Sequence, residues 1–332
     1  MKLLILGGTQ FVGRALAAAA LAGGHDVTLF HRGRTNDDLF PDAEHVHGDR
    51  DGGIGELAGR AFDVCLDTSG YLPRVVRQSA ELLHDRADRY VYVSSVSVYA
   101  DLSAPRDESA GLAALEDETT ESITEETYGG LKALCERAVA EVYGDGGVIV
   151  RPTFVVGPFD HTGRFTWWVQ RGAVGGELLV PEGSAWRIQL IDVRDLARFL
   201  LLAATDSSLS GVYNVVGPGI ETGLVNIVEE AATLAGTIVR PVVVEDDFLV
   251  GHGVSTRELP LWVPDATWAA WAQTSGARAL AAGLVHTPLV ETIHATLDSG
   301  PAGEGASPVD SAEATGLSPE REHELLAAWH GR

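Results

Sequence analysis

The sequence is poor in positive charge. Its 332 residues include 24 lysines and arginines against 47 aspartates and glutamates, which gives a formal net charge of -23 at pH 7. A field of that sign repels phosphate backbones and anionic lipid surfaces. We therefore expect neither nucleic acid nor a membrane as a partner, although a glycine loop or an arginine can still bind an anionic cofactor locally.

Cysteine and long apolar runs are also scarce. The two cysteines, Cys65 and Cys135, stand in apolar-periodic segments and are expected to be reduced core residues. No apolar run reaches the roughly 18 uncharged residues of a membrane span, and Gly7 and Gly8 end the apolar start too early for a signal peptide. No group of histidines, cysteines or acidic residues shows metal-ligand spacing, so we expect no metal. We expect a cytoplasmic protein, either a monomer or a homodimer.

Short β-rich runs alternate with helical patterns in the first half of the chain. Strands are expected at 2–6, 25–30, 44–46, 62–67, 89–93 and 148–150, and helices at 11–22, 74–84 and 127–143. Strands that alternate with helices imply a parallel sheet with right-handed crossovers. The pattern predicts an α/β fold, a doubly wound parallel Rossmann sheet with a smaller C-terminal substrate-binding lobe.

The second half is less regular. Residues 101–126 are acidic and poorly periodic and are expected to form a long surface loop. The units expected in chain order are a dinucleotide-binding domain at 1–155, to which strands and a helix of 188–216 return, a mainly substrate-binding lobe at 156–299, a flexible linker at 300–317 and a helix at 318–332.

A glycine-rich turn follows the first strand directly. Gly7-Gly8-Thr9-Gln10-Phe11-Val12-Gly13 lies between an apolar run and the start of a helical pattern. Such a turn needs glycine for its backbone angles and for close approach of a pyrophosphate, which then faces the free N–H groups of the helix N-terminus. Its position predicts a nicotinamide dinucleotide site, whereas the spacing alone is equally compatible with a tight turn.

The end of the second strand distinguishes NAD from NADP. An acidic residue there would bond the ribose 2′-hydroxyl, whereas arginine can pair with a 2′-phosphate. This chain has His31, Arg32 and Arg34 at that point and no acid. We therefore expect NADP(H), with NAD(H) as the alternative; the two arginines are equally compatible with an ordinary solvated loop.

Tyr128 and Lys132 are four residues apart in a helical pattern and therefore share one helix face. An ammonium beside a phenol favours the phenolate, so this tyrosine can exchange a proton with a carbonyl or hydroxyl group. Ser94-Ser95-Val96-Ser97-Val98-Tyr99 follows a central strand, where ligands of such sheets bind.

In combination these motifs resemble the extended or atypical short-chain dehydrogenase/reductase superfamily, in its NAD-dependent epimerase/dehydratase group. Arg151-Pro152 and the segment Asp192–Ala197 add to the resemblance, which extends over residues 1–204 and more loosely beyond. It implies a catalytic triad of Ser95, with Ser97 as the alternative, Tyr128 and Lys132. The cofactor residues that we expect are Gly7, Thr9, Gln10, Phe11, Val12, Gly13, His31, Arg32, Arg34, Asp49, Arg50, Thr68, Ser69, Gly70, Lys132 and Pro152.

The chain departs from the family pattern in its glycine loop and on its substrate side. Gln10 replaces the middle glycine, and the arginine that binds a substrate diphosphate would fall at Ile188, one position from Arg187. The Gly-Gly-Thr-x-Phe loop also resembles bacterial isoflavone-reductase-like proteins and plastid stem-loop RNA-binding proteins. The expected substrate contacts are Ser97, Phe154, Arg164, Trp168 and Arg187.

Three functions remain open from the sequence. The first is an NADP(H)-dependent ketoreductase acting on a small metabolite. The tryptophans of the C-terminal half are compatible with an aromatic one. The alternative is an NAD-dependent sugar-nucleotide epimerase or dehydratase. The remote alternative is a non-catalytic dinucleotide- or RNA-binding protein, which the net charge disfavours.

Overall fold

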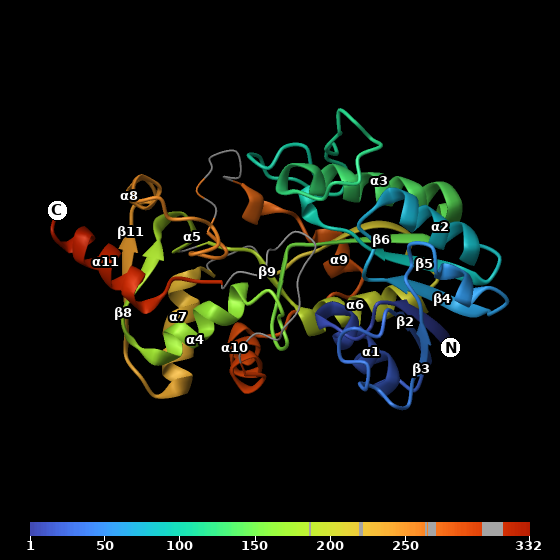
Figure 1. The fold of residues 1–332 in the computed structure, drawn as a ribbon, viewed down its shortest axis with the longest axis horizontal. Coiled ribbons are helices and arrows are strands. Elements are labelled where there is room, and N and C mark those ends of the chain that lie inside the picture. The colour runs from blue at the N-terminus through green and yellow to red at the C-terminus, as the bar shows by residue number, and fades with distance from the viewer. Residues whose placement is uncertain (186, 219–221, 263, 265–269, 301–314) are drawn as a thin grey trace.

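The computed structural model describes all residues except 186, 219–221, 263, 265–269 and 301–314 (Figure 1). Its centre is a seven-stranded, all-parallel sheet in the order β10-β6-β5-β4-β1-β2-β3. The strands are β1 (Lys2–Leu6), β2 (Asp26–His31), β3 (Glu44–His47), β4 (Phe62–Asp67), β5 (Ala87–Val93), β6 (Gly147–Pro152) and β10 (Gly211–Val215). The expected fold class, a doubly wound Rossmann sheet, is confirmed.

The sheet is covered on both faces because its strands are apolar on both sides. In β1, Leu3 and Ile5 face one core cluster, whereas Leu4 and Leu6 face the other. On the first face lie α1 (Phe11–Ala22) and α6 (Val193–Thr205), and on the second lie α2 (Pro73–Leu83) and α3 (Glu125–Tyr143), as Figure 1 shows. Continuous apolar runs of this kind are typical of parallel strands buried on both faces.

The strand order reverses between β1 and β4. The chain passes from β1 outward through β2 and β3 and then returns to the other side of β1. Crevices at such a reversal, outside the carboxyl ends of the strands, are where ligands bind in open α/β sheets. The glycine turn after β1 and the segment 68–70 after β4 meet at this point.

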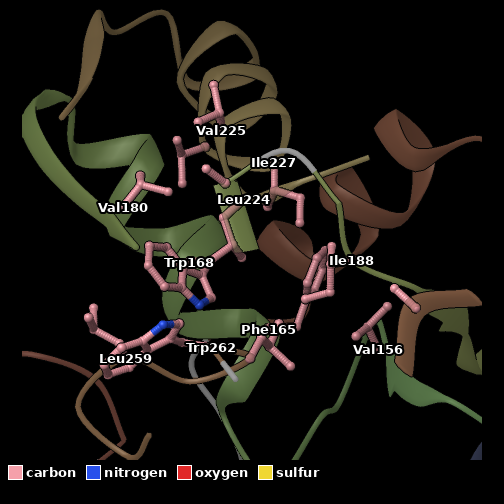
Figure 2. Close-up of a cluster of buried hydrophobic side chains, with 14 of the residues drawn as sticks. Val156, Phe165, Trp168, Val180, Ile188, Leu224, Val225, Ile227, Leu259 and Trp262 are labelled. Carbon is pink, nitrogen blue, oxygen red and sulfur yellow. The ribbon is translucent and has the colours of Figure 1, made fainter. Parts of the chain in front are cut away.

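The second lobe packs α4 (Arg164–Val174) against α7 (Leu224–Ala235) and a small parallel sheet of β8 (Gly176–Pro181) and β11 (Val239–Val244). Its core is an apolar cluster that includes Phe165, Trp168 and Trp262 (Figure 2). The C-terminal helix α11 (Pro319–His330) reaches β8, where the buried Glu322 accepts hydrogen bonds from the Leu179 backbone and from Arg171.

The remaining elements are short or lie between the two lobes. They are η1 (Ile54–Leu57), η2 (Val96–Val98), η3 (Gly144–Gly146), β7 (Phe154–Val156), α5 (Glu182–Ala185), β9 (Leu190–Asp192), α8 (Asp246–Gly251), η5 (Trp271–Gln273), α9 (Ala277–Ala281) and α10 (Leu289–Asp298). None of the helices in the described ranges has both the length and the apolar character needed to cross a bilayer.

Most expected elements are present, with differences at their ends. Helix α3 begins at Glu125 rather than at 127, because Thr124 and Thr127 form a capping box at its N-terminus. From the segment 188–216, β10 joins the main sheet and α6 packs on one of its faces, whereas β9 pairs with β7 in a separate two-stranded sheet. Most of the expected linker at 300–317 lies outside the described residues. Cys65 and Cys135 are buried and unpaired with each other.

Gly172 lets α4 approach α7 closely. A Cβ atom at this position would lie 2.8 Å from both the Cα and the carbonyl oxygen of Val228. We expect Gly172→Ala to lower the free energy of unfolding by roughly 1–2 kcal/mol, because overpacking outweighs the gain in helix propensity. Urea unfolding measures the change. Gly55→Ala is the control, since nothing lies within 4 Å of its added methyl group; equal effects of the two substitutions would contradict the close packing.

Candidate active site

The glycine turn has the geometry that a pyrophosphate site requires. Gly7 and Gly8 have φ angles of +105° and +108°, a region that glycine adopts without strain. A Cβ atom at Gly13 would lie 2.4 Å from the Gly8 nitrogen, so only glycine lets α1 start this close to the turn. The three glycines therefore place no Cβ atom beside the free N–H groups at the start of α1, where a pyrophosphate would bind.

Gln10 occupies the position where the family pattern has a glycine. It is the N-cap residue of α1, and its side chain makes no capping bond. Its amide nitrogen Nε2 is buried and has no hydrogen-bond partner within the described part of the chain. A buried donor without a partner is costly, and a phosphate oxygen at the turn would satisfy it. The substitution is therefore compatible with a dinucleotide.

Thr68 and Ser69 close the other side of the turn. Both hydroxyl groups donate to the Leu6 carbonyl, at 3.0 and 3.2 Å. A Cβ atom at Gly7 would lie 2.5 Å from the Thr68 Oγ1. The structure thus brings the expected cofactor residues after β1 and β4 together at the switch in strand order.

Arg50, which we expected to contact the cofactor, instead pairs with an acidic residue of β4. Its guanidinium makes a bidentate ion pair with the buried Asp67, at 2.6 and 2.8 Å, and also bonds Ser69 and Ser79. Burial lowers the pKa of Arg50, but the Asp67 carboxylate outweighs this effect and raises it above its ordinary value. Burial likewise raises the pKa of Asp67, and Arg50 holds it below the ordinary range. Arg50 thus holds the end of β4 in place through Asp67. Asp49, the other expected cofactor residue of this segment, is exposed.

Lys132 is fully enclosed. Its ammonium donates to the carbonyl oxygens of Gly70, at 2.8 Å, and Val93, at 2.7 Å, and lies 4.5 Å from the centre of the Tyr92 ring. Burial lowers the pKa of Lys132 to about 8. This lysine therefore connects α3 to the carboxyl ends of β4 and β5 and titrates near physiological pH.

Tyr128 lies one turn before Lys132 in the first turn of α3 and is half-buried. The helix approaches the serine segment closely at Gly129, where a Cβ atom would lie 2.1 Å from the Ser97 carbonyl oxygen. The Ser95 hydroxyl accepts a bond from the Ser97 N–H and donates to the Ser97 Oγ, both at 3.1 Å. The structure thus places the expected triad residues on adjacent segments.

Two further hydroxyl groups near the ends of β5 and β6 had no assigned role in the sequence. The Oγ of Ser94 and the Oγ1 of Thr153 are buried and have no partner among the described residues. Thr153 directly follows Pro152, at the end of β6. Its signal was its place after a central parallel strand, the same signal that identified the serines after β5.

The loop 157–163 lies on the first turn of α1, which the sequence did not indicate. The guanidinium carbon of Arg14 is 3.3 Å from the centre of the Phe159 ring, and the rings of Phe11 and His161 meet edge to face at 5.8 Å. Desolvation lowers the pKa of Arg14. This loop therefore borders the glycine turn.

The expected substrate residues separate into different environments. Trp168 is completely buried, and its indole donates to the Pro260 carbonyl at 2.6 Å, so it is a core residue and not a substrate contact. Trp262 is likewise 2% exposed. The guanidinium carbon of Arg164 lies 5.3 Å from the centre of the Phe154 ring, so these two expected substrate residues lie side by side. Arg187 is exposed.

The lowered pKa of Lys132 makes its contribution to stability depend on pH. Between the folded pKa of about 8 and the ordinary value of 10.5, the unfolded chain binds more protons than the folded chain, so stability rises with pH. We expect the difference in unfolding free energy between wild type and Lys132→Met to shift in favour of wild type by about 1.5 kcal/mol from pH 8 to 9.5. Urea unfolding at both pH values measures it.

The control for losing an amino group is Lys2→Met, at the exposed second residue. A difference between wild type and Lys132→Met that stays constant over this pH range would contradict a lowered pKa of Lys132.

Comparison with known proteins agrees with this geometry. Residues 72–216 match the model of a family described as the NAD dependent epimerase/dehydratase family. Over 233 residues the chain is 28% identical to the chloroplast stem-loop binding protein of 41 kDa b from Arabidopsis thaliana. That match covers 65% of this chain and only 58% of the length of the relative.

Solved structures share the fold at low identity. WbmH from Bordetella bronchiseptica, described in complex with NAD+, is 19% identical with a TM-score of 0.67, over 90% of this chain and 97% of that one. UDP-glucuronic acid 4-epimerase from Bacillus cereus, in complex with NAD, is 16% identical with a TM-score of 0.66, over 90% and 96%. Residues 72–216 are therefore similar to the NAD dependent epimerase/dehydratase family, and the glycine turn and the Tyr-x-x-x-Lys helix are compatible with that similarity.

Proposed function

We propose that this chain catalyses an internal oxidation and reduction of the epimerase or dehydratase type, with Tyr128 as the acid/base. The observation that carries the proposal is the buried Lys132 one turn from Tyr128, fixed by the carbonyls of Gly70 and Val93. The family match favours this reaction over the net ketone reduction that the sequence first suggested. The isoflavone-reductase-like branch remains a prediction.

The residues around the glycine turn fit a nicotinamide dinucleotide. The turn is lined by backbone where a Cβ atom would block it, and the unpartnered Gln10 amide is buried beside it. When bound, the nicotinamide supplies a site that accepts a hydride from the substrate and can return it. The helix N-terminus and Thr68 border the part of the site that would hold the pyrophosphate.

Side chains of α3 and of the segment around η2 would transfer the proton and contact the substrate oxygen. The Tyr128 phenol would take the proton of the substrate hydroxyl as its carbon loses hydride, and would return a proton in the reverse direction. A positively charged Lys132 nearby favours the phenolate. Because the Ser95 proton is already donated to Ser97, we assign the contact with the substrate oxygen to Ser97 and a positioning role to Ser95.

The substrate side gives no support to a diphosphate. Ile188, where the family arginine would fall, is 2% exposed, and the neighbouring Arg187 is exposed. The stem-loop binding named for the Arabidopsis relative raises RNA as a second candidate ligand. The net charge of -23 opposes that function for this chain. Cytoplasmic location and a monomeric or homodimeric state remain predictions.

For the cofactor we propose NADP(H) over NAD(H). The last residue of β2 is the buried His31 and not an acidic residue, although the Asp37 carboxylate of the following loop lies 3.7 Å from the His31 Nδ1. Arg32 and Arg34 follow it, are exposed, and have no ion-pair or hydrogen-bond partner in the described ranges. Two unpaired guanidinium groups suit a 2′-phosphate, although the two similar structures described above are complexes with NAD.

Tyr128→Phe tests the acid/base assignment. It removes one hydroxyl oxygen, so turnover of an accepted substrate should fall by about 10²–10⁴-fold, while binding of ADP-ribose, measured by calorimetry, stays unchanged. A panel of sugar nucleotides and hydroxy ketones supplies the substrate. Turnover without net change in cofactor absorbance supports the internal reaction, whereas stoichiometric NADPH loss would make the chain a ketoreductase. Full activity of Tyr128→Phe would refute both.

The NADP proposal has a readout that needs no substrate. Calorimetry should show 2′,5′-ADP binding more tightly than 5′-ADP. Arg32→Ala or Arg34→Ala should weaken only the binding of 2′,5′-ADP, by about tenfold, because a charge-assisted hydrogen bond contributes about 1.5–3 kcal/mol. Arg240→Ala, an exposed change in the other lobe, is the control. Tighter binding of 5′-ADP, or no effect of either arginine, would favour NAD.

A further inference from the structure

Three histidines gather at the carboxyl ends of β2 and β3. His31 is the register partner of His47 on the adjacent strand, and His45 lies two residues before His47 on the same face. The ring centre of His31 is 5.1 Å from that of His45 and 5.0 Å from that of His47. Asp37, from the loop between the strands, lies beside them.

The hydrogen bonds in this group fix which nitrogen atoms carry protons. The Phe40 carbonyl accepts only, so the His45 Nε2 that contacts it at 3.2 Å is the protonated nitrogen. In its neutral form His45 then has a lone pair on Nδ1, to which the His31 Nε2–H donates at 2.9 Å. The Nδ1 of His31 is therefore unprotonated, as its bond from the Gly33 N–H at 3.2 Å also requires.

The His31 Nδ1 lies close to two other potential ligand atoms. The His31 Nδ1 lies 3.7 Å from the Asp37 Oδ1, and the His47 Nε2 lies 2.6 Å from the same oxygen. In the part of the chain that the structure describes, these three residues are the group whose ligand atoms all lie within 4.8 Å of one another. The Gly33 N–H occupies the single lone pair of the His31 Nδ1, so a metal ion has to displace this hydrogen bond.

We propose that His31, Asp37 and His47 bind a divalent transition-metal ion such as Zn²⁺, with one position left for water or another ligand. Two imidazoles and one carboxylate are a ligand set typical of Zn²⁺ and its first-row neighbours. The bond from the His31 Nε2–H to His45 is the outer contact that orients a metal-binding histidine. The reaction proposed above does not require this ion, although His31 also lies at the strand end where we expect the cofactor ribose.

The geometry needs only a small rearrangement. Metal–ligand distances of about 2.0–2.2 Å separate tetrahedral ligand atoms by about 3.3 Å, so His47 and Asp37 must move apart from 2.6 Å. Their side chains are 55% and 51% exposed and can do so. The buried His31 keeps its place, and its Nδ1 exchanges the Gly33 N–H for the ion.

The chain contains a natural control for an ordinary surface pair. His294 and Asp298 form an exposed His–Asp contact at 3.1 Å on α10, and neither belongs to a group of three potential ligands in the described ranges. The chain thus has one His–Asp pair with a third potential ligand, His47 and Asp37, and one without, His294 and Asp298.

The test is metal binding by the full chain after treatment with EDTA. Titration with Zn²⁺ by calorimetry at pH 7.5 should give one site per chain, and Co²⁺ should give the visible absorption of a tetrahedral nitrogen- and oxygen-bound ion. His47→Ala and Asp37→Asn should each weaken Zn²⁺ binding at least about tenfold. Both positions are exposed, so circular dichroism should remain unchanged.

His294→Ala should leave the affinity for Zn²⁺ as it is in wild type. Absence of a one-to-one site, or Zn²⁺ binding that survives both His47→Ala and Asp37→Asn, overturns the proposal, because the ion would then bind elsewhere on the acidic surface. Loss of binding in His294→Ala alone would do the same.

Discussion

The arrangement of the candidate site depends on the buried ammonium group of Lys132. Its bonds to the Gly70 and Val93 carbonyls connect one helix to the ends of two strands. Apart from Lys2, it is the only lysine of the chain, in which all other basic side chains are arginines or histidines. A guanidinium could not replace it, because a planar group of that size does not lose its proton in proteins. Burial can bring the pKa of a lysine close to physiological pH, as it does for Lys132, whereas a guanidinium stays charged.

That same helix sets the spacing of the other reacting groups. Gly129 allows α3 to lie against the Ser97 carbonyl, so the serine segment and Tyr128 approach from adjacent elements. The ion pair of Arg50 with Asp67 performs a different task at the neighbouring strand end, where it keeps a charged side chain buried and ordered. Burying such a pair contributes little net stability, but losing one partner would leave the other charge unpaired.

Much of the fold could be predicted because its determinants are local. The alternation of strands and helices, the glycines after β1 and the four-residue spacing of Tyr128 and Lys132 are all readable within short windows. Helix α3 began two residues before its expected start, since a threonine pair rather than an acidic side chain completes its capping box. Ends of elements depend on such individual hydrogen bonds.

Features that depend on contacts between distant segments were not predictable in this way. The sequence shows His45 and His47 in alternation, but only the register of β2 with β3 brings His31 beside them. Arg50 is expected as a cofactor residue, and nothing in the local sequence shows its ion pair with Asp67, 17 positions away. A tryptophan such as Trp168 is a residue type that often contacts substrates, and only the packing of α4 against α7 shows that this one is buried.

Phe159 on Arg14 and His161 on Phe11 hold the loop 157–163 against the first turn of α1. If a dinucleotide bound at the glycine turn leaves past this loop, both contacts would have to separate first, which would lengthen the residence time of the cofactor on the protein. Long residence suits a catalyst that recovers its hydride in every cycle, whereas an enzyme that consumes NADPH has to exchange it at each turnover.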